Sequence, residues 1–317
     1  MKKRMQILVI VDPALKRSPA LLRAMALARR MEATLQLRLF EYARELEQAV
    51  RHGFDLEAYL RGRRSRLEEF AGHLRREGFT VECGVSWGNP RADQVIRETL
   101  ALSPDFVVKD VEAEPGSLRG RLAGLDWQLL RECPAPLMLV HAGTGNLPKR
   151  IVAALDPLDE NGKPHELNVE ILETANALAM QAGATLDAVH AFDFVPLAAE
   201  PEFMTGWVPD PTLYRDLREL HVQELYRLCR EQGVPPGSMH VLDGDPARVI
   251  PEFAAKHQTS LVVLGSIHRS ALKRLLIGST ALALFDRLAC DVLVLKPAGF
   301  AEQLIAGMPA PRKPKAA

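Results

Sequence analysis

The sequence has few cysteines and no net charge, and both facts narrow the class of protein. The four cysteines are widely spaced and contain no CxxC pair: Cys83, Cys133, Cys229 and Cys290. This spacing predicts reduced, buried thiols rather than disulfides or a zinc site. The 40 Lys and Arg residues are balanced by 40 Asp and Glu residues. Since broad binding to nucleic acid or to an anionic membrane needs a basic face, we expect neither.

Long apolar runs are also lacking. No stretch approaches the about 18 apolar residues of a membrane span. Near the N-terminus, basic residues precede the apolar run Ile7–Val11, but this run is too short for the core of a signal peptide. Asp12-Pro13 then ends the run without a small-residue cleavage site. We therefore expect a soluble protein of the cytoplasm.

The chain repeats itself at an offset of about 150 residues. The segment ILVIVDP from Ile7 returns as IVAALDP from Ile151, and the triplet ATL at Ala33 returns at Ala184. CPAPLMLV near the end of the first copy corresponds to CDVLVLK in the second. Because the period is far longer than the 20 to 50 residues of a solenoid, one duplicated unit explains the pattern. A chain of 317 residues is also above the usual size of one core, which favours two domains.

Each copy alternates short apolar strands with amphipathic helices. This alternation predicts a parallel sheet wound on both sides, and so an α/β protein with two Rossmann-like domains of five strands each. The predicted domains cover residues 1–143 and 149–299, and a disordered tail rich in Pro and Lys covers residues 300–317. The clearest predicted helices are Pro19–Met31, Leu56–Glu77, Glu166–Gln181 and Thr212–Gln232.

The carboxyl ends of the strands in the second copy carry the candidate ligand-binding residues, because doubly wound sheets bind ligands there. These ends are predicted at Asp156, around His190, at the Gly244 loop and at Gly265. The stretch VLGSIHRSALKRLLIGSTA continues from Gly265 through a basic loop to a helix start with exposed N–H groups and hydroxyls. A glycine, a basic loop and a helix N-terminus favour phosphate binding. The alternative is that Ser279 only caps the helix and the basic residues face solvent.

The spacing G-x-x-H-x9-G-S from Gly265 to Ser279 resembles the G-x-x-G-x9-G-[S/T] motif of ATP-binding universal stress proteins. The duplication, the aspartate after each first strand and the cysteine before each last strand fit the same family. The segments DWQLLRECPAPLMLV and CDVLVLKP are similar to those of tandem, E-type members. The resemblance covers nearly the whole chain and implies the adenine nucleotide alpha hydrolase-like fold.

The resemblance also implies a ligand and a role. An adenine nucleotide, ATP alone or with Mg²⁺, would lie across the strand ends of the second copy of a regulator of bacterial stress resistance. Asp156 would contact the adenosine end, and the backbone near Val189 would flank the base. The residues implied around the ribose and phosphates are Gly265, His268, Arg269, Gly278, Ser279 and Thr280. His268 replaces the second glycine of the motif, and its imidazole either crowds the phosphates or donates to them.

The first copy departs further from the motif. Lys109-Asp110 follows its strand where the second copy has the glycine, and no Gly-Ser helix start follows at the right distance. We predict that this copy has lost its nucleotide site and that Asp12 is kept as a turn or cap residue. Because family members dimerise through their last strands, the resemblance implies that Leu137–Val140 pairs with Asp291–Lys296 in an intrachain pseudo-dimer. Whether two chains also form a homodimer is left open.

Other chemistry has less support. His190, His268 and Asp156 together would suit zinc or manganese, but scattered histidines are more often ordinary hydrogen-bonded residues, so no metal site is predicted. A triad of Ser279, His268 and Asp156 lacks a nucleophile elbow. No catalytic residue is therefore predicted, and slow ATP hydrolysis is the most that we expect.

The segment from Ala191 to Pro211 is long, apolar and rich in proline. Such segments are uncommon in compact domains. One interpretation is a loop packed on the first domain or on a partner subunit. The other is one wall of a pocket for a hydrophobic or acylated ligand, which would make the protein a binding module for a lipid-like molecule.

Overall fold

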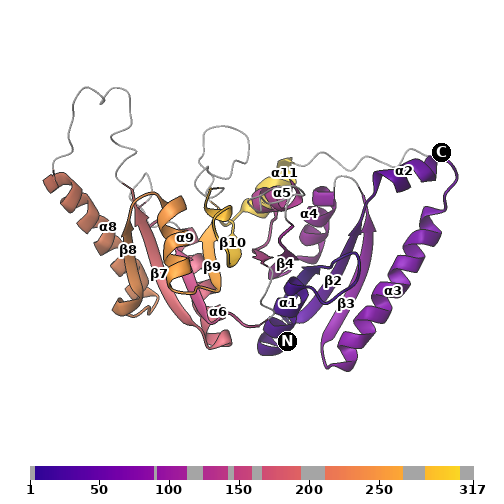
Figure 1. Ribbon diagram of the computed structural model, residues 1–317, viewed down its shortest axis with the longest axis horizontal. Helices are drawn as coiled ribbons and strands as arrows, with labels where there is room; N and C mark the ends of the chain where they lie inside the picture. Colours follow the sequence, from indigo (N-terminus) through magenta and orange to yellow (C-terminus); the bar gives the residue numbers. More distant parts are fainter. Residues whose placement is uncertain are drawn as a thin grey trace, which may run out of the picture.

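The computed structural model describes residues 4–88, 91–112, 124–141, 146–158, 166–193, 211–266 and 283–307. In these ranges the chain forms one ten-stranded sheet with helices on both faces (Figure 1). The strands are β1 (Gln6–Ile10), β2 (Thr34–Glu41), β3 (Thr80–Trp87), β4 (Phe106–Asp110), β5 (Leu137–Val140), β6 (Arg150–Ala154), β7 (Thr185–Phe192), β8 (Met239–Asp243), β9 (Leu261–Gly265) and β10 (Asp291–Leu295). The helices are α1 (Pro19–Met31), α2 (Arg44–Arg51), α3 (Leu56–Arg76), α4 (Arg91–Leu102), α5 (Gly124–Glu132), α6 (Glu166–Ala182), α8 (Pro211–Glu231), α9 (Pro246–Lys256) and α11 (Phe300–Gly307), with a short 3-10 helix η2 (Pro236–Ser238).

The order of the strands shows the duplication directly. The sheet runs β3-β2-β1-β4-β5-β10-β9-β6-β7-β8, so each half has the same order when it is followed from its outer edge inward. Within each half all neighbouring strands are parallel. The predicted doubly wound parallel sheets are therefore confirmed. The chain winds in opposite directions from β1 and from β6, which places a switch point at the carboxyl end of each of these strands.

The two halves join through their last strands. Strand β5 pairs antiparallel with β10, and Leu139 lies opposite Val292. The predicted pairing of these two strands is confirmed, and it makes the sheet continuous. The predicted domain boundary between residues 143 and 149 stays a prediction, because residues 142–145 lie outside the described ranges.

A separate hydrophobic core covers each face of the sheet. In β1, Ile7 and Val9 belong to one core, while Leu8 and Ile10 belong to the other. Helices α1, α3, α6 and α8 cover the first face, and α4, α5 and α9 cover the second. Because the central strands, such as β1, β5, β9 and β10, are buried on both sides, they read as continuous apolar runs in the sequence. Each core includes residues of both halves.

Local signals set the ends of the best-defined helices. Ser18 precedes α1 in an extended conformation, its side chain accepts a hydrogen bond from the Leu21 N–H at 3.4 Å, and Pro19 takes the first helical position. Asp245 caps α9 in the same way by accepting from the Ala247 N–H at 3.0 Å. Such caps satisfy N–H groups that have no partner within the helix. The predicted bounds of α1 are confirmed, and those of α3, α6 and α8 agree within one residue.

The beginning of the predicted disordered tail is helical instead. Helix α11 occupies Phe300–Gly307, and Phe300 is buried with its ring 5.2 Å from the Lys296 ammonium. The prediction of disorder is therefore wrong for these residues, because one aromatic side chain finds a place in the core of the fold. Residues 308–317 lie outside the described ranges.

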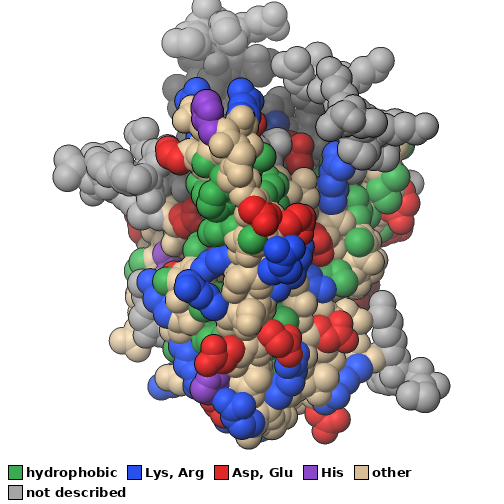
Figure 2. All heavy atoms as spheres, turned by 90° about the vertical axis from the view of Figure 1, so that its right-hand side faces the viewer, with side chains coloured by type: hydrophobic (Ala, Val, Ile, Leu, Met, Phe, Trp, Pro, Cys, Tyr) green, Lys and Arg blue, Asp and Glu red, His purple; other side chains and the backbone are tan. Residues whose placement is uncertain are grey.

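The edge of the sheet beside β3 is covered by α3, and Figure 2 shows this side of the molecule. Basic and acidic side chains are interspersed on it rather than gathered by sign. Ion pairs within α3, such as Arg64 with Glu57 at 3.7 Å, account for part of this pattern. A mixed surface of this kind does not present the basic stripe on which nucleic-acid binding depends. In the described ranges, no helix has the length and apolar character needed to cross a membrane.

Candidate functional site

The turn after β6 holds Asp156 at the carboxyl edge of the second half. Asp156 is exposed, but its backbone is fixed by the buried Asn168 of α6. The Asn168 Oδ1 accepts from the Asp156 N–H at 3.2 Å, and its Nδ2 donates to the Asp156 carbonyl at 2.5 Å. The backbone that carries the Asp156 carboxylate is therefore held in place by Asn168. Asn168 was missed in the sequence; its only signal is a polar residue on an otherwise apolar helix face.

Val189 lies on the neighbouring strand β7 and is completely buried. Its carbonyl accepts a hydrogen bond from the Leu155 N–H at 2.9 Å, so this oxygen already has a partner at the edge of β6. Its side chain packs in the core that α9 covers. The structure thus brings Val189 close to Asp156 along the same edge.

A pair of histidines connects β7 to α8. His190 is buried; its Nδ1 lies 3.0 Å from the Leu155 carbonyl, and its Nε2 lies 2.8 Å from His221 Nδ1. Since a carbonyl only accepts, the His190 Nδ1 carries the proton, and in the neutral pair His221 Nδ1 must donate to His190 Nε2. Burial lowers the pKa of both imidazoles, while Asp156 raises that of His221 by stabilising its charged form. The pair was missed in the sequence, because His190 and His221 are 31 positions apart.

Gly265 ends β9, directly beside β6. A Cβ at this position would lie 2.6 Å from Leu167 Cδ2 and 3.1 Å from Ile171 Cδ1 of α6. Its φ is not among the positive values, so the close approach of α6, and not a left-handed turn, requires the glycine.

Ser266 and Lys296 form a polar contact behind this strand end. Burial lowers the pKa of the Lys296 ammonium to about 8. Its Nζ donates to Ser266 Oγ at 2.9 Å, to the Arg131 carbonyl at 3.2 Å and to the Leu130 carbonyl. The two carbonyls belong to the last turn of α5, where a helix leaves carbonyl groups without partners and attracts cations. A helix of the first half therefore supports the residue that follows Gly265.

Of the eight residues predicted to bind the nucleotide, three lie in the described ranges. Asp156, Val189 and Gly265 come together at the carboxyl ends of β6, β7 and β9, which are adjacent in the sheet. The other five lie outside these ranges: His268, Arg269, Gly278, Ser279 and Thr280. Residues 194–210 of the apolar segment also lie outside them. In the part of the chain that is described, no group of three His, Cys, Asp or Glu side chains could hold a metal ion.

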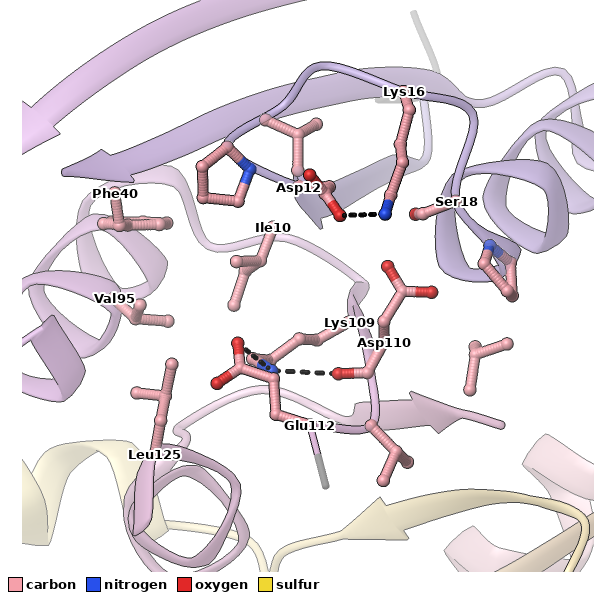
Figure 3. Close-up of a pocket in the computed structure, with 15 residues that line it drawn as sticks. Ile10, Asp12, Lys16, Ser18, Phe40, Val95, Lys109, Asp110, Glu112 and Leu125 are labelled. Carbon is pink, nitrogen blue, oxygen red and sulfur yellow. Dashed lines mark hydrogen bonds and ion pairs between the residues drawn. The ribbon is translucent and has the colours of Figure 1, made fainter. Parts of the chain in front are cut away.

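The first half places charged residues at the equivalent edge. Asp110 pairs with Val140 at the end of β4 as Gly265 pairs with Leu295 at the end of β9. The Asp110 Oδ1 accepts from the Ala20 N–H at 2.8 Å, at the start of α1. Asp12 closes its turn by accepting from the Ala14 N–H at 2.7 Å, which confirms its predicted role. A cavity of about 280 Å³ lies between these groups (Figure 3).

Curated relatives match nearly the full length of the chain. Universal stress protein E of Escherichia coli K12 is 28% identical over 305 residues, which is 92% of this chain and 93% of that protein. The universal stress protein E homolog of Haemophilus influenzae is 27% identical over 308 residues, with 92% and 97% covered. The similarity therefore extends through both halves.

Solved structures share the arrangement of the whole chain. A functionally unknown protein from Pseudomonas aeruginosa PAO1 has a TM-score of 0.73 and 25% identity, with 95% of this chain and 96% of that chain covered. A universal stress protein from Archaeoglobus fulgidus has a TM-score of 0.60 at 16% identity, with 92% and 96% covered, which shows a common fold. The model of the universal stress protein family matches residues 148–296, the half that carries Gly265. The chain is thus similar along nearly its whole length to E-type universal stress proteins, and its second half matches the model of the universal stress protein family.

Proposed function

We propose that this protein binds an adenine nucleotide, ATP alone or with Mg²⁺, at the carboxyl edge of its second half and acts as a regulator of stress resistance in the bacterial cytoplasm. One observation carries the proposal: equivalent strand ends hold Gly265 in the second half and Asp110 in the first. A phosphate can approach the backbone of a glycine, whereas a carboxylate at the same place repels it. We therefore infer that an anionic ligand would approach the strand end at Gly265 rather than the one at Asp110.

The surroundings of Gly265 support the same ligand. The sheet switches its winding direction at β6, so the exposed Asp156 and Gly265 lie at the carboxyl ends of two adjacent strands, β6 and β9. A carboxylate at this place can accept hydrogen bonds from ribose hydroxyls, while the loop after Gly265 carries the basic residues that phosphates need. Binding, rather than turnover, follows from these groups, because they orient a nucleotide and include no water-activating pair.

Calorimetric titration of the full chain with ATP tests the proposal. We expect saturable binding that Ser279→Ala and Asp156→Ala each weaken by about tenfold, the usual effect of one hydrogen bond to a charged group. Asp12→Ala is the matched control, since Asp12 has the place of Asp156 in the first half, and it should leave the affinity unchanged. Failure to bind ATP at millimolar concentration would rule the proposal out. ATP hydrolysis that Ser279→Ala abolishes would identify an enzyme instead of a regulator.

A further inference from the structure

The first half has a cavity at the carboxyl ends of its own strands. The volume of about 280 Å³ is near the lower limit of small-molecule sites, and a doubly wound sheet binds ligands at this place. Its lining includes residues of β1, β2, β4 and β5 and of the turn before α1. The question is which kind of molecule these side chains would accept.

One wall of the cavity is apolar. Ile10, Phe40, Val95 and Leu125 lie together on this side, and the view in Figure 3 shows them facing the charged residues across the space. Ile10 and Phe40 are also buried parts of the core on this face of the sheet. Contact between such a wall and an apolar part of a ligand lowers the free energy of binding. The same wall has no ligand groups for a hydrated metal ion.

The other wall carries an excess of negative charge. It is lined by three carboxylates and two ammonium groups: Asp12, Asp110, Glu112, Lys16 and Lys109. The buried Asp126 lies 2.8 Å behind Lys109 and adds a fourth carboxylate. Among the described residues, these four negative and two positive charges leave a balance of −2. This balance disfavours phosphates and favours cations.

Both ammonium groups form ion pairs with carboxylates of the chain. Lys109 Nζ donates to the Asp110 carbonyl at 2.9 Å, and it forms ion pairs with Asp126 Oδ1 at 2.8 Å and with Glu112 Oε1 at 2.9 Å. Lys16 lies 3.2 Å from the Asp12 carboxylate, as Figure 3 shows. The positive groups are thus held by carboxylates of the chain itself.

The Asp110 carboxylate faces the space between the ammonium groups of Lys16 and Lys109 (Figure 3). One of its oxygens accepts the Ala20 N–H, and in the described ranges no Lys, Arg or His side chain pairs with its carboxylate. The carboxylate points into the cavity between Lys16 and Lys109 (Figure 3). Its second oxygen can therefore accept a hydrogen bond from a ligand.

The geometry points to a second ligand site in the first half, which binds a small organic cation: a primary ammonium group on Asp110 and an apolar body against Phe40 and Val95. This inference is independent of nucleotide binding in the second half. The first half would then prefer a cation where the second half prefers a phosphate. The cause is one residue at the end of β4, where Asp110 stands in the position of Gly265. An ammonium–carboxylate hydrogen bond beside an apolar wall is stronger than the same contact in water.

Three small molecules with the same ring and different charge test the inference: tyramine as the cation, tyrosol as the neutral alcohol and 4-hydroxyphenylacetate as the anion. Each is titrated into the full chain by calorimetry. We expect tyramine to bind at least about tenfold more tightly than tyrosol, and the acid not to bind. Asp110→Asn keeps the size of the side chain and an oxygen for the Ala20 N–H, and it should remove the preference for tyramine.

Asp55→Asn is the matched control. Asp55 is an exposed carboxylate in the same half that accepts from a helix amide, the Ala58 N–H at 2.8 Å, and it lies outside the cavity. This variant should bind tyramine like the wild type. If Asp110→Asn fails to fold, as judged by circular dichroism, Glu112→Gln takes its place and should weaken tyramine binding. Equal binding of the three compounds, no binding of tyramine at millimolar concentration, or full binding by the substituted proteins would overturn the inference.

Discussion

At the scale of single residues, the packing of the second half depends on one position that has no room for a side chain and on two histidines whose protonated form is disfavoured by burial. Gly265 leaves the space that Leu167 of α6 occupies. His190 and His221 share one hydrogen bond in a buried place, and burial holds the pKa of each below its ordinary value. Both features lie beside Asp156, so the stability of the candidate site and its shape rest on the same few contacts.

Gly265→Ala should destabilise the protein by about 1–3 kcal/mol, because the new methyl group overlaps Leu167 Cδ2. Leu167→Ala alone should also destabilise it by leaving a cavity. In the double variant the alanine at position 265 should cost much less, since the overlapping atoms are gone. Urea unfolding of the four proteins measures this coupling. Additive effects would show that the two residues do not compete for space.

The histidine pair should make stability fall as the pH decreases from about 6.5. Both imidazoles have a lowered pKa in the folded protein, so below this pH the unfolded chain binds more protons than the folded one. His190→Gln keeps a donor for the Leu155 carbonyl and should show a shallower decrease. The measurement is the free energy of unfolding between pH 7 and pH 5. Identical slopes would mean that the pair does not titrate.

Asp291 acts in the opposite direction and must be considered in the same pH range. Burial raises its pKa to about 6, against the attraction of Arg23. Its protonation therefore favours the folded state as the pH falls through about 6, and its cost is felt above that pH. Because Asp291 is present in both proteins, its contribution cancels when the wild type is compared with His190→Gln.

At the scale of elements, strand β10 is attached to the first half at both of its ends. At its beginning, the Asp291 Oδ2 lies 2.7 Å from the Arg23 guanidinium of α1, and both side chains are 2% exposed. The Asp291 Oδ1 accepts from the His141 N–H at 3.0 Å. Just after the strand, Lys296 donates to the end of α5. These polar contacts fix the register of β10 against β5.

Removal of one partner of the Arg23–Asp291 pair should cost about 3–5 kcal/mol, because the other charge stays buried without it. Arg23→Met and Asp291→Leu are each expected to have this effect. The double variant should regain most of the loss, since two apolar side chains need no desolvation of charge. Chemical denaturation measures the three differences. If the double variant lost the sum of the two single effects, the pair would not be the cause.

The sequence predicted the elements that its local patterns specify. Apolar strand runs, the helical patterns between them and the repeat predicted the helices α1, α3, α6 and α8 and the parallel order of each half. Helix α2 was missed because none of its residues is buried, and α11 because its anchoring depends on the distant Lys296. Asn168 and Lys296 were missed in the candidate site because, like α11, they depend on contacts with residues that are distant in the sequence. Their roles depend on partners that only the folded chain brings near.

At the scale of the whole molecule, duplication has produced two edges with different chemistry on one continuous sheet. Register relates the two halves residue by residue, yet Gly265 in one corresponds to Asp110 in the other. The two halves are joined through β5 and β10, and the difference between their edges is set by the sequence of each half. Under the two proposals, one half binds an anionic nucleotide and the other binds a cation.

The central claim is that the two edges are not equivalent for nucleotide binding. Native mass spectrometry of the full chain with ATP tests it most directly, because it counts the bound molecules. We predict one ATP on each chain at saturation, and none after Gly278→Val. No bound ATP, or two molecules on each chain, would contradict the assignment of the nucleotide site to the second half alone.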